Sequence, residues 1–153
     1  MLRVNMTEDQ EPPARLRALA SWQANKVAVL GARMTARHMP LTARAEFAVL
    51  AALEEYGPLS QADLGRRLGL DRNDVSGLVG RLVSAGQVDR RPDADDRRRN
   101  VVTLTDPGRD RLAEIQAGAD AAQADLLANL TAAERSTLNA LLAKVLAGHP
   151  LDA

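Results

Sequence analysis

Residues 57–109 read GPLSQADLGRRLGLDRNDVSGLVGRLVSAGQVDRRPDADDRRRNVVTLTDPGR, and they carry the clearest structural signals in this chain of 153 residues. Ser60 with Asp63 three residues later is a helix-start signal of the capping-box type. Asp71 with Asp74 repeats that signal eleven residues further on. Two helices so short and so close together are typical of a helix-turn-helix.

The second helix of this pair is expected over residues 72–85, with two unlike faces. Its apolar residues recur at helical spacing and predict a buried side made of Val75, Leu78, Val79 and Leu82. The other side carries Arg72, Asn73, Ser76, Gly77 and Arg81. Arginine pairs naturally with guanine edges and asparagine with adenine edges, so this side is expected to read duplex DNA. Ser60 and Gln61, where the first helix starts, are expected to contact phosphate through free backbone N–H groups.

A β-hairpin, or wing, is expected after the helix pair. Residues 88–91 and 100–105 alternate like strands around a polar tip. The guanidinium groups at this tip suit the narrow, strongly negative minor groove of DNA, and they belong to Arg97, Arg98 and Arg99. A hydrated loop tip that touches nothing is the alternative interpretation.

The distribution of charge favours a polyanionic partner, although the formal net charge is zero. Residues 66–99 contain nine arginines and six aspartates, which gives this segment a local charge of +3. Exposed charges are screened beyond about 8 Å at physiological salt, so the segment can bind phosphate while the rest of the molecule stays acidic. A solvated charged surface is the alternative.

The composition excludes several kinds of site. The chain has no cysteine and only two histidines, which removes disulfides, thiolate chemistry and cysteine-ligated metals. A calcium-binding loop is disfavoured because the wing lacks its glycine and distal glutamate, although the wing contains Asp93, Asp95 and Asp96. No serine has a histidine nearby and no glycine-rich phosphate loop is present. We therefore predict no catalytic residue, no cofactor and no metal site.

Helical periodicity continues on both sides of the quoted stretch. Residues 12–37 predict one helix and residues 42–56 a second, which Thr42 can cap. From Asp106 a long helix places its apolar residues as in a coiled-coil seam, and a capping box at Thr131 begins the last helix. The first and last helices have no obvious place to bury their apolar stripes in so small a domain. We expect them to pair with those of a second chain.

The expected fold is mainly α, a single domain over residues 1–153. It combines a winged helix-turn-helix lobe over residues 42–107, with a small β-hairpin wing, and a helical dimerisation lobe over residues 12–40 and 108–148. No apolar run approaches the length needed to cross a bilayer, and the acidic start differs from that of a signal peptide. We expect a cytoplasmic protein with no membrane partner.

In this order and spacing, the residues resemble the MarR family of winged-helix transcriptional regulators. The resemblance spans nearly the whole chain and rests on several short segments together. These segments are Leu41-Thr42 with Glu46-Phe47 and Val49-Leu50, Pro58-Leu59-Ser60 with Asp63-Leu64, Arg81-Leu82 with Ala85-Gly86, and Asp95-Asp96-Arg97-Arg98 leading to Val102 and Leu104-Thr105.

The resemblance implies a homodimer that binds a palindromic operator, with two recognition helices in major grooves and a wing arginine in each flanking minor groove. Asp96 and Arg98 match the Asp-x-Arg pattern of the family's wing. We expect Asp96 to brace the wing through a charge-assisted bond and Arg98 to insert into the groove. Repression is the default that the resemblance implies, with release by a small aromatic or phenolic acid bound between the two lobes.

A cavity for such an acid is hypothesised from the combination of an aromatic wall and a cation. The residues assigned to it are Trp22, Arg37, His38 and Phe47. Packing in the core is the alternative for the two aromatic side chains.

Three residues of the expected recognition helix leave a second class of function open. Gly77 and Gly80 weaken a helix and offer no side chain, and Asp74 lies where phosphates are expected. The alternative is a dimeric winged-helix adaptor that docks on a protein and binds operators weakly or not at all. A steep loss of duplex affinity with salt would favour the DNA reader over the adaptor.

Overall fold

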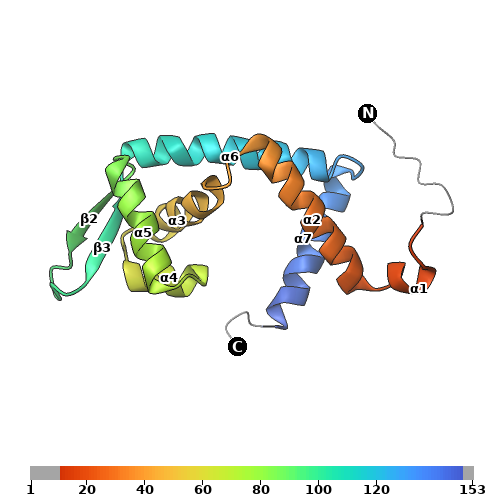
Figure 1. The fold of residues 1–153 in the computed structure, drawn as a ribbon, viewed down its shortest axis with the longest axis horizontal. Helices are drawn as coiled ribbons and strands as arrows, with labels where there is room; N and C mark the ends of the chain where they lie inside the picture. The colour runs from red at the N-terminus through yellow and green to blue at the C-terminus, as the bar shows by residue number, and fades with distance from the viewer. Residues whose placement is uncertain (1–10, 150–153) are drawn as a thin grey trace.

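The structure is a computed structural model that describes residues 11–149, and it is mainly helical with one small antiparallel sheet (Figure 1). This is the predicted fold class. The elements of the described residues are, in order, α1 (Ala14–Arg17), α2 (Ala20–His38), α3 (Ala43–Tyr56), β1 (Leu59–Ser60), α4 (Gln61–Leu68), α5 (Arg72–Ser84), β2 (Val88–Pro92), β3 (Asn100–Leu104), α6 (Asp106–Leu126) and α7 (Ala132–Ala147).

Helix α6 runs along the length of the molecule and joins two lobes (Figure 1). The winged lobe, with α3, α4, α5 and the sheet, lies at one end, and α2 and α7 lie at the other. Leu112 and Ile115 of α6 belong to the core of the winged lobe, whereas Leu126 lies against Gly31 of α2. The expected boundary between residues 107 and 108 therefore does not separate the two lobes, because α6 packs against the core of both.

The core of the winged lobe is built from the periodic apolar residues of α3, α4 and α5 and from the inner face of the sheet. Its largest fully buried side chains are Leu50, Leu64, Leu82, Val49, Val75, Val79, Val88 and Val102. Phe47 is half-buried and packs against this cluster. The predicted buried side of α5 is thus confirmed.

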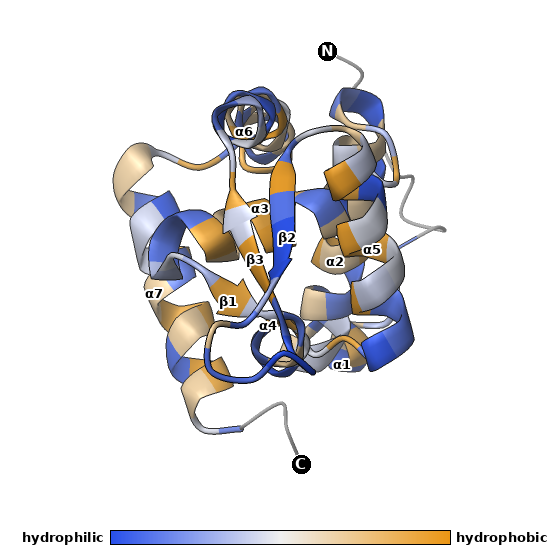
Figure 2. Ribbon diagram, turned by 90° about the vertical axis from the view of Figure 1, so that its left-hand side faces the viewer, coloured by the Kyte–Doolittle hydropathy of each residue, from blue (hydrophilic) through white to orange (hydrophobic). Residues whose placement is uncertain are grey.

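The sheet contains a strand that sequence reasoning missed. The strand order in the sheet is β1-β3-β2, and β1 is the strand that was missed (Figure 2). Leu59 of β1 lies opposite Val102, and Val88 of β2 lies opposite Leu104. Strands β2 and β3 form the predicted wing. β1 has only two residues, too few to produce an alternating pattern. It nevertheless ties the start of α4 to the wing, because Ser60 stands opposite Val101.

Two predictions about the first helices need correction. The single helix expected over residues 12–37 is interrupted, because Leu19 is extended (φ −81°, ψ 118°) between α1 and α2. The Gln23 side chain donates to the Arg17 carbonyl oxygen (2.6 Å) and so satisfies a carbonyl at the end of α1. Thr42 precedes α3 as predicted but makes no side-chain cap, since its own backbone is already helical (φ −67°, ψ −26°).

Helix α7 begins at the predicted capping box but leaves its apolar face uncovered. The Thr131 hydroxyl accepts the Glu134 N–H (3.3 Å), and Glu134 Oε2 accepts the Thr131 N–H (2.8 Å). Leu141 and Val145 are 58% and 62% exposed, and α2 likewise exposes several large apolar side chains. Within residues 11–149, no helix combines the length and apolar character needed to span a membrane.

Candidate nucleic-acid interface

Two hydrogen-bonded caps set the geometry of the helix-turn-helix. The Ser60 hydroxyl accepts the N–H of Asp63 in α4 (3.0 Å), and Asp71 Oδ1 accepts the N–H of Asp74 in α5 (2.8 Å). Gly69 ends α4 with a left-handed backbone (φ 62°), which lets the chain turn directly into α5. Both caps are the ones predicted.

The exposed side of α5 carries the residues assigned to base reading. They are Arg72, Asn73, Ser76, Gly77 and Arg81. Two hollows flank this side of the helix. The larger, of about 520 Å³, lies between α4, α5 and the wing and includes Arg72 and Ser76. The smaller, of about 370 Å³, includes Asn73, Gly77 and Arg81.

We call the larger hollow the arginine cleft, because five arginines line it. They are Arg66, Arg72, Arg90, Arg98 and Arg99. Ser60 and Gln61 also line it, so the start of α4, predicted to contact phosphate, and the wing, predicted to enter the minor groove, meet in one place. Sequence reasoning missed Arg66 and Arg90 as interface residues, and the run of basic residues in this segment was the available signal. Such a cluster suits the phosphates of a nucleic acid.

The wing loop is held by its own backbone and by two aspartates. The Arg98 N–H donates to Asp96 Oδ1 (3.0 Å), and the Asp95 N–H donates to Asp93 Oδ1 (2.9 Å). The Arg99 N–H donates to the Asp96 carbonyl oxygen (2.9 Å). Asp96 therefore braces the loop beside Arg98. In the described part of the chain, no three histidine or acidic side chains are arranged to hold a metal ion.

The three wing arginines have different surroundings in the structure. Arg99 Nη2 lies 3.2 Å from the Ser60 hydroxyl and 3.6 Å from Asp63 Oδ2. Within residues 11–149, the side chains of Arg97 and Arg98 have no hydrogen bond or ion pair, although Arg98 lines the cleft. Arg99 is thus tied to α4, while its two neighbours are open to a ligand.

Besides the N–H that bonds to the Ser60 cap, Asp63 has a side chain that interacts with its neighbours. The Ser60 hydroxyl donates to Asp63 Oδ2 (2.6 Å), and Arg66 pairs with Asp63 Oδ1. The Ser60 hydrogen bond, with the positive charges of Arg66 and Arg99, lowers the pKa of Asp63 below its ordinary value. The carboxylate therefore stays ionised inside a basic surface.

The residues hypothesised to bind an aromatic acid are not brought together. Trp22 lies near the start of α2, where Lys26 sits 5.3 Å from its ring centroid, and Arg37 and His38 lie at the other end. Arg37 follows Trp22 by fifteen positions along the α-helix, a distance of about 22 Å. His38 Nε2 lies 2.7 Å from Asp125 Oδ2 of α6, and Phe47 packs on the core of the other lobe.

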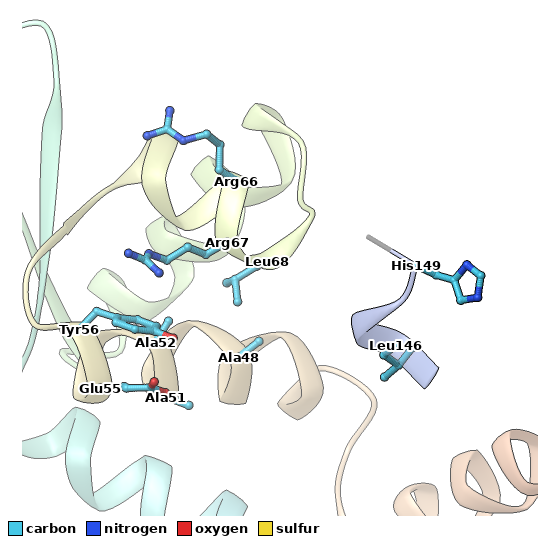
Figure 3. A pocket seen from close by; sticks show the side chains of 10 residues that line it. All are labelled: Ala48, Ala51, Ala52, Glu55, Tyr56, Arg66, Arg67, Leu68, Leu146 and His149. Atoms are coloured by element: carbon cyan, nitrogen blue, oxygen red, sulfur yellow. The ribbon is translucent and has the colours of Figure 1, made fainter. Parts of the chain in front are cut away.

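A pocket between the lobes does exist, with other residues in its wall (Figure 3). It has a volume of about 630 Å³ and lies between α3 and α4 on one side and the end of α7 on the other. The Arg67 guanidinium stacks over the Tyr56 ring, 4.0 Å from its centroid. Leu146 reaches the pocket from α7, whereas the His149 ring points away from the other labelled side chains in Figure 3.

The chain is similar to known regulators over most of its length. The MarR family model matches residues 40–99. The multiple antibiotic resistance protein MarR of Escherichia coli is 35% identical over 104 residues, covering 67% of this chain and 72% of that protein. The transcriptional repressor NicR of Pseudomonas putida is 34% identical over 101 residues, covering 66% of this chain and 64% of NicR. The chain spans about three fifths of the length of several such curated relatives.

Solved structures agree with these similarities. A probable transcriptional regulator from Pseudomonas aeruginosa superposes with a TM-score of 0.71 at 32% identity, covering 86% of this chain and 99% of that one. BpsR of Bordetella bronchiseptica, whose DNA binding is regulated by 6-hydroxynicotinic acid, superposes with a TM-score of 0.69 at 27% identity, covering 82% and 96%. With the winged helix-turn-helix described above, these matches establish that the chain belongs to the MarR family of winged-helix transcriptional regulators.

Proposed function

We propose that this protein binds duplex DNA sequence-specifically as a homodimer and regulates transcription, as a repressor acting at a palindromic operator. The observation that carries the proposal is the arginine cleft beside the exposed side of α5. In this arrangement Arg72, Asn73, Ser76, Gly77 and Arg81 read bases in the major groove. Ser60 and Gln61 hold a phosphate through backbone N–H groups, and Arg97 and Arg98, braced by Asp96, enter the minor groove.

The second copy is proposed on the uncovered apolar faces of α2 and α7. Leu30 of α2 is 43% exposed and Leu142 of α7 is 44% exposed, and hydrophobic side chains gain about 25 cal/mol per Å² when covered. Pairing of these helices would place two copies of α5 on one face of the DNA. The two half-sites would then lie about 34 Å apart, one turn of B-form DNA.

The test begins with fragments of genomic DNA from the source organism, selected by the purified protein. Affinity for the selected duplex and for an unrelated duplex is then measured over a range of salt concentrations. For the wild type, log K should fall by about 0.9 per phosphate contact for each decade of salt, with the selected duplex preferred throughout. Weak binding that ignores sequence would favour the adaptor over the DNA reader.

Variants assign the roles within the interface. Arg98→Ala should weaken binding to every duplex, whereas Asn73→Ala and Arg72→Ala should change the order of preference among duplexes. Arg109→Ala, at an exposed arginine near the start of α6, is the control and should leave binding unchanged. Equal losses on every duplex for the three interface variants would contradict the assignment.

We further propose that a small aromatic acid releases the DNA by binding in the pocket between α3, α4 and α7. Arg67 stacked on Tyr56 offers a cation and an aromatic surface side by side, as an aromatic carboxylate requires. The regulation of BpsR by 6-hydroxynicotinic acid supports this class of ligand.

The effector proposal is tested by calorimetry with a panel of hydroxybenzoic and hydroxynicotinic acids, followed by DNA-release assays. Arg67→Gln should abolish the response to an acid that releases the wild type, while Arg37→Gln should not. A response lost in Arg37→Gln and kept in Arg67→Gln would return the site to α2. If no acid in the panel releases the DNA, the proposed effector site is wrong.

A further inference from the structure

A side chain of the wing reaches the start of α4, in addition to the backbone pairing of β1 with β3. Arg99 lies where the wing loop meets β3, next to the last paired residues of the ladder, Pro92 and Asn100. Its guanidinium reaches back across 39 residues to the Ser60 hydroxyl (3.2 Å) and approaches Asp63 Oδ2 (3.6 Å). The backbone pairing of β1 with β3 ends at Ser60 and Val101, so Arg99 extends this connection toward the tip of the wing.

The chemistry of the contact differs from that of a phosphate-binding arginine. Ser60 is buried, with 6% of its surface exposed, and its hydroxyl serves Asp63 and Arg99 together. Asp63 accepts from Ser60 and pairs with Arg66, so it is an ionised acid surrounded by partners. A carboxylate at a surface that binds phosphate repels it unless it is neutralised from within the protein. Arg66 and Arg99 supply that neutralisation here.

We propose that Asp63 and Arg99 form a positioning pair that holds the wing against the start of α4 and thereby sets the distance between Arg98 and α5. In this role Arg99 orders the interface without contacting phosphate, whereas Arg98 is the contacting residue. The inference rests on the proposed DNA binding and deepens it. It assigns specificity to a residue that touches no base.

Asp63 could either repel DNA or anchor the wing, and removing its negative charge should change DNA affinity in opposite directions in these two cases. If Asp63 only repels DNA, Asp63→Asn should tighten binding to every duplex. If it anchors the wing, Asp63→Asn should lower affinity for the selected duplex about tenfold, the loss expected for one hydrogen bond to a charged group. The loss on an unrelated duplex should be smaller. Asp95→Asn, at an exposed aspartate of the same wing, is the matched control for charge alone and should tighten binding.

The salt dependence of affinity separates positioning from contact. Arg98→Gln should reduce the slope of log K against log salt by about 0.9, the value for one lost phosphate contact. Arg99→Gln should leave the slope unchanged while lowering the preference for the selected duplex. The double variant Asp63→Asn with Arg99→Gln should lose no more than the worse single variant, because both changes remove one contact.

Folding is checked by thermal unfolding of each variant, and Asp63→Glu, which keeps the charge, should restore part of the specificity. The proposal is overturned if Asp63→Asn binds as tightly as Asp95→Asn, or if Arg99→Gln loses the same slope as Arg98→Gln. Failure of the proposed function has a different signature, in which the wild type prefers no duplex and Arg98→Gln changes nothing.

Discussion

Arg111 of α6 donates from both Nε (3.2 Å) and Nη2 (3.0 Å) to a single oxygen, Oε2 of Glu46 in α3. The two side chains are 28% and 21% exposed, and the interaction with Glu46 is the main cause that raises the pKa of Arg111. Arg111 also donates to Glu114 of its own helix (3.2 Å), whose side chain is 70% exposed. This ion pair joins the winged lobe to the helix that runs into the other lobe.

Breaking the pair from the side of Glu46 should destabilise the protein. Glu46→Gln leaves the half-buried guanidinium without its charged partner, and we expect a loss of about 1–2 kcal/mol, between the values for exposed and buried pairs. Glu114→Gln removes only the exposed partner and should cost less than about 0.5 kcal/mol. Urea denaturation measures both, and equal losses would contradict the assignment of the stabilising contact to α3 and α6.

Alanine substitutions at Gly77 and Gly80 of α5 should stabilise the helix and can be measured independently of DNA binding. A Cβ at Gly80 meets nothing within 4 Å, and one at Gly77 meets only Arg81 Nη1 at 3.8 Å. Alanine at either position should therefore stabilise the protein by up to about 1 kcal/mol, because no clash offsets the gain in helix propensity. Thermal unfolding measures this gain, and destabilisation by either variant would contradict it.

The same two variants should differ in DNA binding. If the backbone at Gly77 approaches the bases closely, Gly77→Ala weakens binding to the selected duplex while Gly80→Ala does not. Titration of labelled duplex with each variant is the measurement. Unchanged affinity in Gly77→Ala would place this residue outside the interface.

A charge on the apolar face of α7 should prevent dimer formation. Leu141→Glu and Val145→Glu each add a charge at a side chain that is more than half exposed in one copy, so the folded subunit should tolerate them. Burial of that charge in an interface is strongly unfavourable. Light scattering should report a single subunit for both variants and a dimer for Ala143→Glu, which changes another side of the same helix. A dimer in all three would exclude this face.

The first turn of α7 should loosen in acid. The Thr131 N–H, and secondarily its hydroxyl, lower the pKa of Glu134 below its ordinary value of 4.5. A carboxyl whose pKa is lower in the folded state stabilises the fold fully above its unfolded pKa, and the effect is lost as the pH falls through the folded pKa. The protection factor of the Thr131 amide, which is its exchange rate corrected for the intrinsic pH dependence of exchange, should therefore fall below about pH 4.5. In Glu134→Gln this pH dependence should disappear, and its persistence would point to another group.

Local hydrogen bonds make several elements predictable from the sequence alone. The caps at Ser60, Asp71 and Thr131 each join groups three residues apart, so the identity of those residues suffices to place the helix starts. The two faces of α5 follow equally from the spacing of its apolar side chains. The interruption between α1 and α2 at Leu19 could not be predicted in this way, because nothing in the apolar pattern marks it.

Contacts between distant residues depend instead on how the elements pack. Arg97, Arg98 and Arg99 are chemically identical. The packing of β3 beside β1 and α4 brings Arg99 to Asp63, while Arg98 lines the cleft. Trp22 and Arg37 share a helix but lie at its opposite ends, while Tyr56 and Arg67 meet because α3 packs beside α4. Periodicity and capping act over one or two helical turns, so they define faces and boundaries. Which faces meet is set by the free energy of packing the whole chain.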